Sequence, residues 1–275
     1  MKNKNLNTRF LIVLVLLLGA CKEKPVIIPD FSVPKGDRNV LIEEFTGVRC
    51  VNCPNGAKII EEMVAEFGDR VVPISIHHGF FAKPLKQSKS DLNCHCGYGD
   101  AVTETLGKGP IGYPAAVINR QKLGSKLFPN KDEWKSIVLN ALKQPAPVNI
   151  FLKVSGDASN SQWTLDVNLA ASEPLDDLFI TAVLLESDII DAQILPDNSL
   201  DENYNFQHVV RMPITDAAGE SLPALASGEV KEMKGFKTFA LQPEWDYKHC
   251  SIAVFVHHKS TGTEVLQAAS IHLEN

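Results

Sequence analysis

Two cysteines separated by two residues lie between a predicted strand and a predicted helix, and this arrangement restricts the fold more than any other part of the chain. Residues 43–63 read EEFTGVRCVNCPNGAKIIEEM, in which the cysteines are Cys50 and Cys53. Residues 39–45 are β-prone, the segment after Cys53 has the apolar spacing of an amphipathic helix, and residues 71–76 form a second apolar run. The order strand, helix, strand predicts a βαβ unit with a right-handed crossover. The cysteines then lie at the start of its helix.

That position has chemical consequences for the two thiols. The unpaired N–H groups and partial positive charge of a helix N-terminus stabilise a thiolate, so the pKa of a cysteine there falls below its ordinary value of about 8.5. We therefore expect Cys50 to be an exposed nucleophile and Cys53, one turn further, to be the resolving thiol. Arg49 adds a positive charge beside Cys50. His77, at the same end of the predicted sheet, is a candidate to help ionise Cys50, and its alternative role is to cap a strand end.

The segment VLIEEFTGVRCVNCP resembles the active-site segment of the thioredoxin superfamily. The resemblance implies that Glu44, six positions before Cys50, is buried near Cys53 and relays its proton; the alternative is a partly exposed strand carboxylate. It also implies a cis-proline beside the cysteine pair, and Pro114, in the turn GYP before the apolar run AAVIN, matches. A helix with an apolar face follows and ends near residue 144. Valine and asparagine replace the usual Gly-Pro between the cysteines, so the direction of any redox reaction is not predicted.

The N-terminus has the pattern of a secretory signal. Basic residues in MKNKNLNTRF precede the apolar run LIVLVLLLGA, which is too short to cross a bilayer as a mature helix. The sequence Leu18-Gly19-Ala20-Cys21 resembles a bacterial lipobox. The resemblance implies cleavage after residue 20, lipidation of Cys21 and anchoring in the outer membrane, on its periplasmic or cell-surface face; the alternative is an ordinary signal with Cys21 as a bystander. The proline-containing residues 21–37 predict an extended tether.

Charge and the remaining cysteines bear on the partners. The formal net charge of −6, without a block of like charge, argues against a nucleic-acid partner. An exported chain lies where disulfides persist. Cys94 and Cys96, in NCHC before Pro114, leave three alternatives: an auxiliary redox couple that exchanges with Cys50 and Cys53, a zinc or copper(I) site built from all four cysteines and a histidine, or a local staple. We favour no metal, and no cofactor beyond a redox-active disulfide.

Residues 148–275 have a different pattern. Short β-prone runs separated by turn residues, with no helical period, predict a β-sandwich of immunoglobulin-like type. They contain no group of residues that suggests catalysis, and Cys250 is expected to be buried. The predicted fold class is therefore an α/β thioredoxin-like domain at residues 38–147 and an all-β immunoglobulin-like sandwich at residues 148–275, after a signal peptide at residues 1–20 and the tether.

The chain as a whole resembles the twenty-eight-kilodalton outer-membrane protein family, lipoproteins with a thioredoxin-like domain followed by a β-sandwich. The resemblance is carried by LIEEFTGVRCVNCPNG, SIHHG, IGYPAAVINR, ENYNFQHVVR and VFVHHKSTGTEVLQA. It implies the location and the architecture but no activity. Two functions remain open. One is a thiol–disulfide oxidoreductase acting on exported proteins, with Cys50, Cys53, Glu44 and Pro114 as catalytic residues. The other is a non-enzymatic binding lipoprotein whose cysteines form a structural bridge or a metal site.

Overall fold

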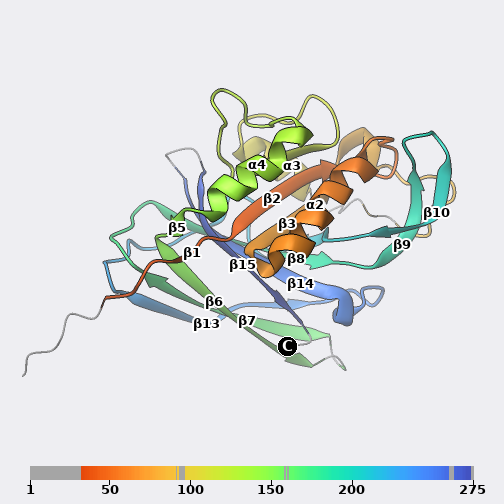
Figure 1. Cartoon of the computed structure of the whole chain (residues 1–275). Coiled ribbons are helices and arrows are strands. Elements are labelled where there is room, and N and C mark those ends of the chain that lie inside the picture. Colours follow the sequence, from red (N-terminus) through yellow and green to blue (C-terminus); the bar gives the residue numbers. More distant parts are fainter. Residues whose placement is uncertain are drawn as a thin grey trace, which may run out of the picture. The chain divides into compact units, whose positions relative to one another are not determined.

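The computed structural model describes residues 32–90, 92, 97–157, 159, 161–259 and 263–273, and the part from Ser32 onwards is one compact unit (Figure 1). Its α-helices are α2 (Cys53–Phe67), α3 (Tyr98–Thr105) and α4 (Lys131–Leu142), and short 3-10 helices cover Gly68–Arg70, Gly79–Ala82 and Tyr247–His249. Its strands are β1 (Gly36–Asp37), β2 (Val40–Thr46), β3 (Val71–His77), β4 (Ala115–Ile118), β5 (Pro145–Ala146), β6 (Val148–Asp157), β7 (Gln162–Ala171), β8 (Leu178–Glu186), β9 (Ile189–Ile194), β10 (Leu200–Phe206), β11 (Val209–Pro213), β12 (Glu220–Ser221), β13 (Val230–Ala240), β14 (Cys250–His258) and β15 (Val265–His272). Every helix in this described part is too short or too polar to cross a bilayer.

The βαβ unit predicted around the cysteines is present. β2 and β3 pair in parallel, α2 connects them, and β4 pairs antiparallel with the other edge of β2. The apolar faces of α2 and α4 pack on one side of these strands, as their spacing predicts (Figure 1). Ile60 and Met63 of α2 are buried there with Trp134 and Val138 of α4. This packing fixes the start of α2, and therefore the cysteines, at the end of β2.

The two predicted domains share one sheet. Its strand order is β15-β14-β8-β11-β3-β2-β4, with β12 beside β8, so four strands of the second half continue without a gap into three strands of the first half. β11 pairs in parallel with β3, where Val209 lies opposite Ser75. A domain boundary was expected at residue 147 and Gly36–Asp37 was expected in the tether, whereas β5 at the end of the first predicted domain pairs with β1. The two halves join because one edge of β3 is unpaired within the βαβ unit. β11 pairs with that edge and forms hydrogen bonds with its backbone.

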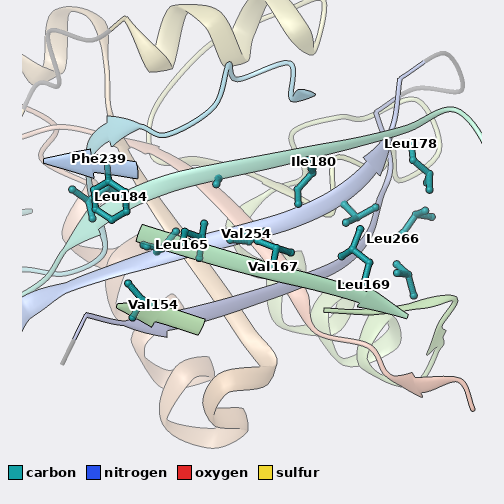
Figure 2. Packing of buried hydrophobic residues seen from close by; sticks show 14 of the residues in the cluster. Val154, Leu165, Val167, Leu169, Leu178, Ile180, Leu184, Phe239, Val254 and Leu266 are labelled. Carbon is teal, nitrogen blue, oxygen red and sulfur yellow. The ribbon is translucent and has the colours of Figure 1, made fainter. Parts of the chain in front are cut away.

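The second half is rich in strands, as predicted. A sheet of order β13-β7-β6 faces β8, β14 and β15, and alternate side chains of both layers fill the space between them. Figure 2 shows these buried side chains, which include Leu165 and Val167 on one layer and Leu184 and Val254 on the other. The opposite faces of β8 and β14 pack with β2 and β3 in a second core, which holds the two halves together.

The turn after β4 ties three strands together. Asn119 and Arg120 both have positive φ, 48° and 51°, and the N–H groups of Leu41 and Val265 donate to the side-chain and backbone oxygens of Asn119 at 2.8 and 2.9 Å. The Arg120 guanidinium donates two 2.8 Å hydrogen bonds to the Glu43 carboxylate, and neither side chain is exposed. Glu43 therefore faces the shared core, while its neighbour Glu44 faces α2, because successive strand residues alternate between faces.

Candidate functional site

The cysteine pair lies at the junction between β2 and α2. Cys53 is the first residue of the 15-residue α2, and Cys50 lies in the loop before it. A disulfide joins them, with an S–S distance of 2.08 Å. The N–H of Cys50 donates to the Gly47 carbonyl at 3.0 Å and the N–H of Cys53 to the Cys50 carbonyl at 3.2 Å, so the loop is tightly closed. The disulfide is therefore placed at a helix N-terminus, which favours a thiolate after reduction.

A cis proline contacts the first turns of α2, and the predicted cis bond is confirmed. The Tyr113–Pro114 peptide bond is cis, and β4 begins at the next residue. A Cβ added at Gly56 of α2 would lie 2.8 Å from the Cβ of Pro114 and 2.7 Å from Oε1 of Glu44. Such contacts are too short for real side chains. Glycine at position 56 thus allows the helix, the proline and the carboxyl group to meet.

Glu44 is buried at this meeting point, with 1% of its surface exposed. Burial, followed by the negative charge of Glu61, raises the pKa of Glu44 to about 8. Its Oε1 has no hydrogen-bond partner among the residues that the structure describes. At pH 7 Glu44 is consequently a neutral carboxylic acid that can give up or take a proton near neutrality.

Cys50 is not exposed, which corrects the expectation from the sequence. Cys50 and Cys53 expose 3% and 2% of their surfaces. The hairpin of β9 and β10, residues 189–206, lies over the cysteine loop (Figure 1), and we call it the hairpin cap. Ile194 N–H donates to the Val48 carbonyl at 3.0 Å, and Gln193 Nε2 donates to the Cys50 carbonyl at 3.1 Å. Gln193 lies 143 positions after Cys50, so no local pattern predicts this cover.

Arg49 holds a second segment over the cysteine loop. Its N–H donates to the Phe81 carbonyl at 2.9 Å, and its guanidinium donates to the carbonyls of Lys83, at 2.7 Å, and Pro84. The guanidinium was expected to favour ionisation of Cys50. In this arrangement its Nε and Nη2 groups donate to the loop that follows β3, so the side chain orders that loop.

His77 is a neutral, buried side chain at the end of β3. Its ring lies edge to face with Phe206 of the hairpin cap, with centroids 5.3 Å apart. Burial, followed by the positive charge of Arg211, lowers the pKa of His77 to about 3, although Asp191 acts in the opposite direction. His77 therefore carries no positive charge with which to ionise a thiol at neutral pH.

Asp191 anchors the hairpin cap to the rest of the chain. Its carboxylate accepts hydrogen bonds from the N–H groups of Lys89 and Ser90 at 2.8 Å each and from Ser90 Oγ at 2.7 Å. Burial acts to raise the pKa of Asp191, but these bonds and the N–H of Ala192 outweigh it and hold the pKa below its ordinary value. The fully buried carboxylate stays ionised and connects the loop after β3 to β9.

A cavity of about 400 Å³ lies beside Cys53, between α2, the ends of β2 and β3, and the hairpin cap. Sequence reasoning assigned Glu44, Cys53 and His77, which line it, but missed Gln193, Tyr204 and Phe206. The segment ENYNFQHVVR supplies Tyr204 and Phe206, and it was noted only as part of a resemblance. The two aromatic residues between polar ones in this segment indicated a strand with an aromatic face. The sequence did not indicate that this face lies against the cavity.

The other predicted site residues stand apart. Cys21, Cys94 and Cys96 lie outside the described residues. Cys250 is a free thiol with none of its surface exposed, and burial raises its pKa to about 12, so the expected buried role is confirmed. Within the described ranges, no group of three or more histidine, cysteine, aspartate or glutamate side chains could hold a metal ion. Cys50 and Cys53 could ligate a metal only after their disulfide is reduced.

Comparison with solved structures finds related folds. HBP35 of Porphyromonas gingivalis is 24% identical with a TM-score of 0.67, and the match covers 88% of this chain and 77% of that one. A protein of Agrobacterium tumefaciens is 14% identical with a TM-score of 0.53, covering 87% and 96%. A domain of the outer membrane lipoprotein Omp28 from Porphyromonas gingivalis is 19% identical with a TM-score of 0.32, covering 46% and 88%. The likenesses to the first two structures concern the fold alone. No curated protein matches the chain.

The family itself is identified by sequence. The model of the family described as Outer membrane protein Omp28 matches residues 108–274. This match includes the cis proline, the hairpin cap and all strands of the second half, and it covers more than half of the 275 residues. The chain therefore belongs to the Omp28 family, and it is an outer membrane protein.

Proposed function

We propose that this outer membrane protein exchanges disulfides with exported proteins through Cys50 and Cys53, in a thioredoxin-like core formed by β2, α2, β3, β4 and α4. The single observation that carries the proposal is the convergence on α2 of a cis Pro114, Gly56 and a protonated, buried Glu44 next to the disulfide. A disulfide that served only as a staple would need neither an acid with a pKa near neutrality nor a cis proline beside it.

The chemistry starts from the oxidised pair present here. A thiolate of a substrate protein attacks Sγ of Cys50, the Cys50–Cys53 bond breaks, and a mixed disulfide forms. Cys53 leaves as a thiolate and takes the proton of Glu44. A second substrate thiolate then attacks the substrate sulfur of the mixed disulfide, forms the substrate disulfide and releases Cys50 as a thiolate at the helix N-terminus. Two electrons pass from the substrate dithiol to the cysteine pair, and the reverse sequence reduces a substrate disulfide.

Two features of the surface bear on substrate access. A depression of about 750 Å³ adjoins Pro114 and is lined by Asn52 and Asn55 of the cysteine segment and by Tyr113 and Phe128. It offers an extended peptide a place next to the disulfide. The hairpin cap buries Cys50, so attack on its sulfur requires the cap to move away from Val48 and Cys50.

Redox titration tests the proposal. The mature protein is equilibrated in glutathione and thiol buffers, alkylated, and mapped by mass spectrometry. An exchange-active pair has a reduction potential between about −270 and −120 mV, whereas a structural disulfide lies below about −300 mV. Insulin-disulfide reduction should be lost in Cys50→Ser and retained in Cys250→Ser, because Cys250 is buried in the other core. Cys53→Ser should accumulate mixed disulfides.

A second candidate is a non-enzymatic binding lipoprotein with a structural disulfide. It is favoured by the burial of both cysteines beneath the hairpin cap. A potential below about −300 mV, together with no reduction of insulin, would select it. Either candidate is compatible with a lipid anchor, which we propose at Cys21. A palmitate analogue fed to cells should label the wild type and spare Cys21→Ser, and equal labelling of the two would exclude the anchor.

A further inference from the structure

The cavity beside Cys53 has the size and position of a small-molecule site. Its volume of about 400 Å³ falls within the roughly 300–1,000 Å³ that such sites occupy. Its floor is built by alternate residues of two neighbouring parallel strands. Glu44 lies opposite Ser75 and Thr46 opposite His77, so all four side chains face the same side of the sheet and line the cavity.

The walls of the cavity are mainly apolar. α2 contributes Cys53, Ala57 and Ile60, and the hairpin cap contributes the rings of Tyr204 and Phe206, which lie edge to face with centroids 4.7 Å apart. The charged side chains that line it, Lys58 and Glu61 on α2, belong to positions that are exposed or half-buried and carry opposite signs. The lining therefore holds no excess of fixed charge with which to select an ion.

Two polar atoms of the side chains that line the floor of the cavity have no hydrogen-bond partner in the part of the chain that the structure describes. Glu44 Oε1 and His77 Nδ1 are buried without a hydrogen bond from any described residue. A buried polar atom left unpaired costs about 1–3 kcal/mol, so its retention calls for a specific reason, such as a ligand that pairs with it. Burial keeps Glu44 protonated and His77 uncharged at pH 7, so the acid has an O–H to donate. At pH 7 the floor therefore presents a carboxyl O–H and an uncharged imidazole, which suit an uncharged molecule with a hydrogen-bond acceptor.

We propose that this cavity binds a compact, uncharged, largely apolar molecule that carries a hydrogen-bond acceptor such as a ketone or quinone carbonyl. The carbonyl oxygen accepts from the Glu44 carboxyl group, and the apolar body lies between α2 and the rings of the hairpin cap. This site is on the α2 side of the sheet and is distinct from the depression next to Pro114, which adjoins other residues. The inference does not rest on disulfide exchange, since binding is measured without turnover.

The test uses a neutral naphthyl ketone, 6-propionyl-2-dimethylaminonaphthalene, whose fluorescence responds to apolar surroundings and to hydrogen bonding at its carbonyl. The mature protein should bind it saturably at one site. Ala57→Phe fills the cavity from α2 without removing a polar group and should weaken binding at least ~10-fold. Ala65→Phe places the same substitution at an exposed position of the same helix and should bind like the wild type.

Substitutions of Glu44 test the proposed hydrogen bond to the ligand carbonyl. They also test the site itself if Ala57→Phe does not fold. Glu44→Gln keeps an N–H donor and should bind within ~3-fold of the wild type, whereas Glu44→Leu should lose about tenfold or more, the equivalent of one hydrogen bond. Equal affinity of Ala57→Phe and Ala65→Phe, or of Glu44→Leu and the wild type, would overturn the site. Tighter binding of a naphthyl trimethylammonium ion than of the ketone would overturn the assignment of an uncharged ligand.

Discussion

The protonated state of Glu44 predicts an unusual dependence of stability on pH. The carboxyl group has an ordinary pKa of 4.5 in the unfolded chain and of about 8 in the fold. Between these values the folded chain holds a proton that the unfolded chain has released. The free energy of unfolding therefore falls as pH rises from 4.5 to about 8, and the stabilisation is complete only below pH 4.5.

The size of the effect follows from the interval. Each pH unit between the two pKa values is worth about 1.4 kcal/mol, so the whole interval from 4.5 to about 8 corresponds to about 5 kcal/mol. Water does not screen this effect appreciably, because only 1% of the surface of Glu44 is exposed. Domains are stable by roughly 5–15 kcal/mol, so this one carboxyl group controls a large share of the total.

Glu44→Gln removes the titration while keeping the shape of the side chain. Urea unfolding at intervals from pH 5 to pH 8 should show the wild type losing stability relative to Glu44→Gln by about 1.4 kcal/mol per pH unit, or roughly 0.5 M in the midpoint for a steep transition. Taking the difference cancels the histidines, which titrate in both proteins. Glu62→Gln, the same substitution at an exposed position of α2, should leave the wild-type pH profile unchanged. A difference between wild type and Glu44→Gln that stays constant within about 0.5 kcal/mol would refute a protonated Glu44.

Three further predictions address the buried Arg120–Glu43 pair, His77 at the floor of the cavity, and the loop after β3 that covers the cysteines. Arg120→Met should lower the free energy of unfolding by about 3–5 kcal/mol, because it leaves the buried Glu43 carboxylate without its partner. Lys135→Met, which breaks an exposed ion pair, should lower it by at most about 1 kcal/mol. Similar losses in urea unfolding would show that burial does not strengthen the Arg120–Glu43 pair. The pKa of His77 is lowered to about 3, so the wild type should lose stability relative to His77→Gln as pH falls from 6.5 towards 3, and a flat difference would exclude a buried neutral imidazole. Gly47→Ala places a methyl group 2.4 Å from the loop backbone and should accelerate reduction of the disulfide by dithiothreitol, whereas Gly112→Ala, where the methyl meets nothing within 4 Å, should not.

The local arrangement around the cysteines could be predicted, and the long-range contacts could not. The strand and the amphipathic helix follow from residue patterns within short segments, and the cis bond before Pro114 was implied by the resemblance of the cysteine segment to the thioredoxin superfamily. The burial of Cys50 depends on Gln193 and Ile194, far along the chain, and nothing in either segment specifies the other. The same holds for β11: its pairing with β3 merges two regions whose separate patterns suggested two domains.

The neutral state of His77 illustrates why charge could not be predicted from sequence. A histidine at a strand end beside a cysteine pair is equally compatible with an exposed imidazolium and with a buried imidazole. The outcome is decided by Phe206, which covers the ring, and by Arg211, whose positive charge opposes protonation. Glu44 and Glu43 likewise differ by one position, yet one is paired with Arg120 and the other is left as an acid, because their faces of the sheet differ.

The residues between β1 and β2 contact the last strand, so these contacts can form only when the end of the chain is present. Arg38 Nη2 donates to the Val265 carbonyl at 2.6 Å and Asn39 Nδ2 to the Ala268 carbonyl at 2.9 Å, across 227 and 229 positions of sequence. A chain that emerges with its N-terminus first presents β2 and the cysteines long before these partners and the hairpin cap arrive. Cys50 and Cys53 are thus made before the hairpin cap that buries them, and the cap can cover them only after residues 189–206 have emerged.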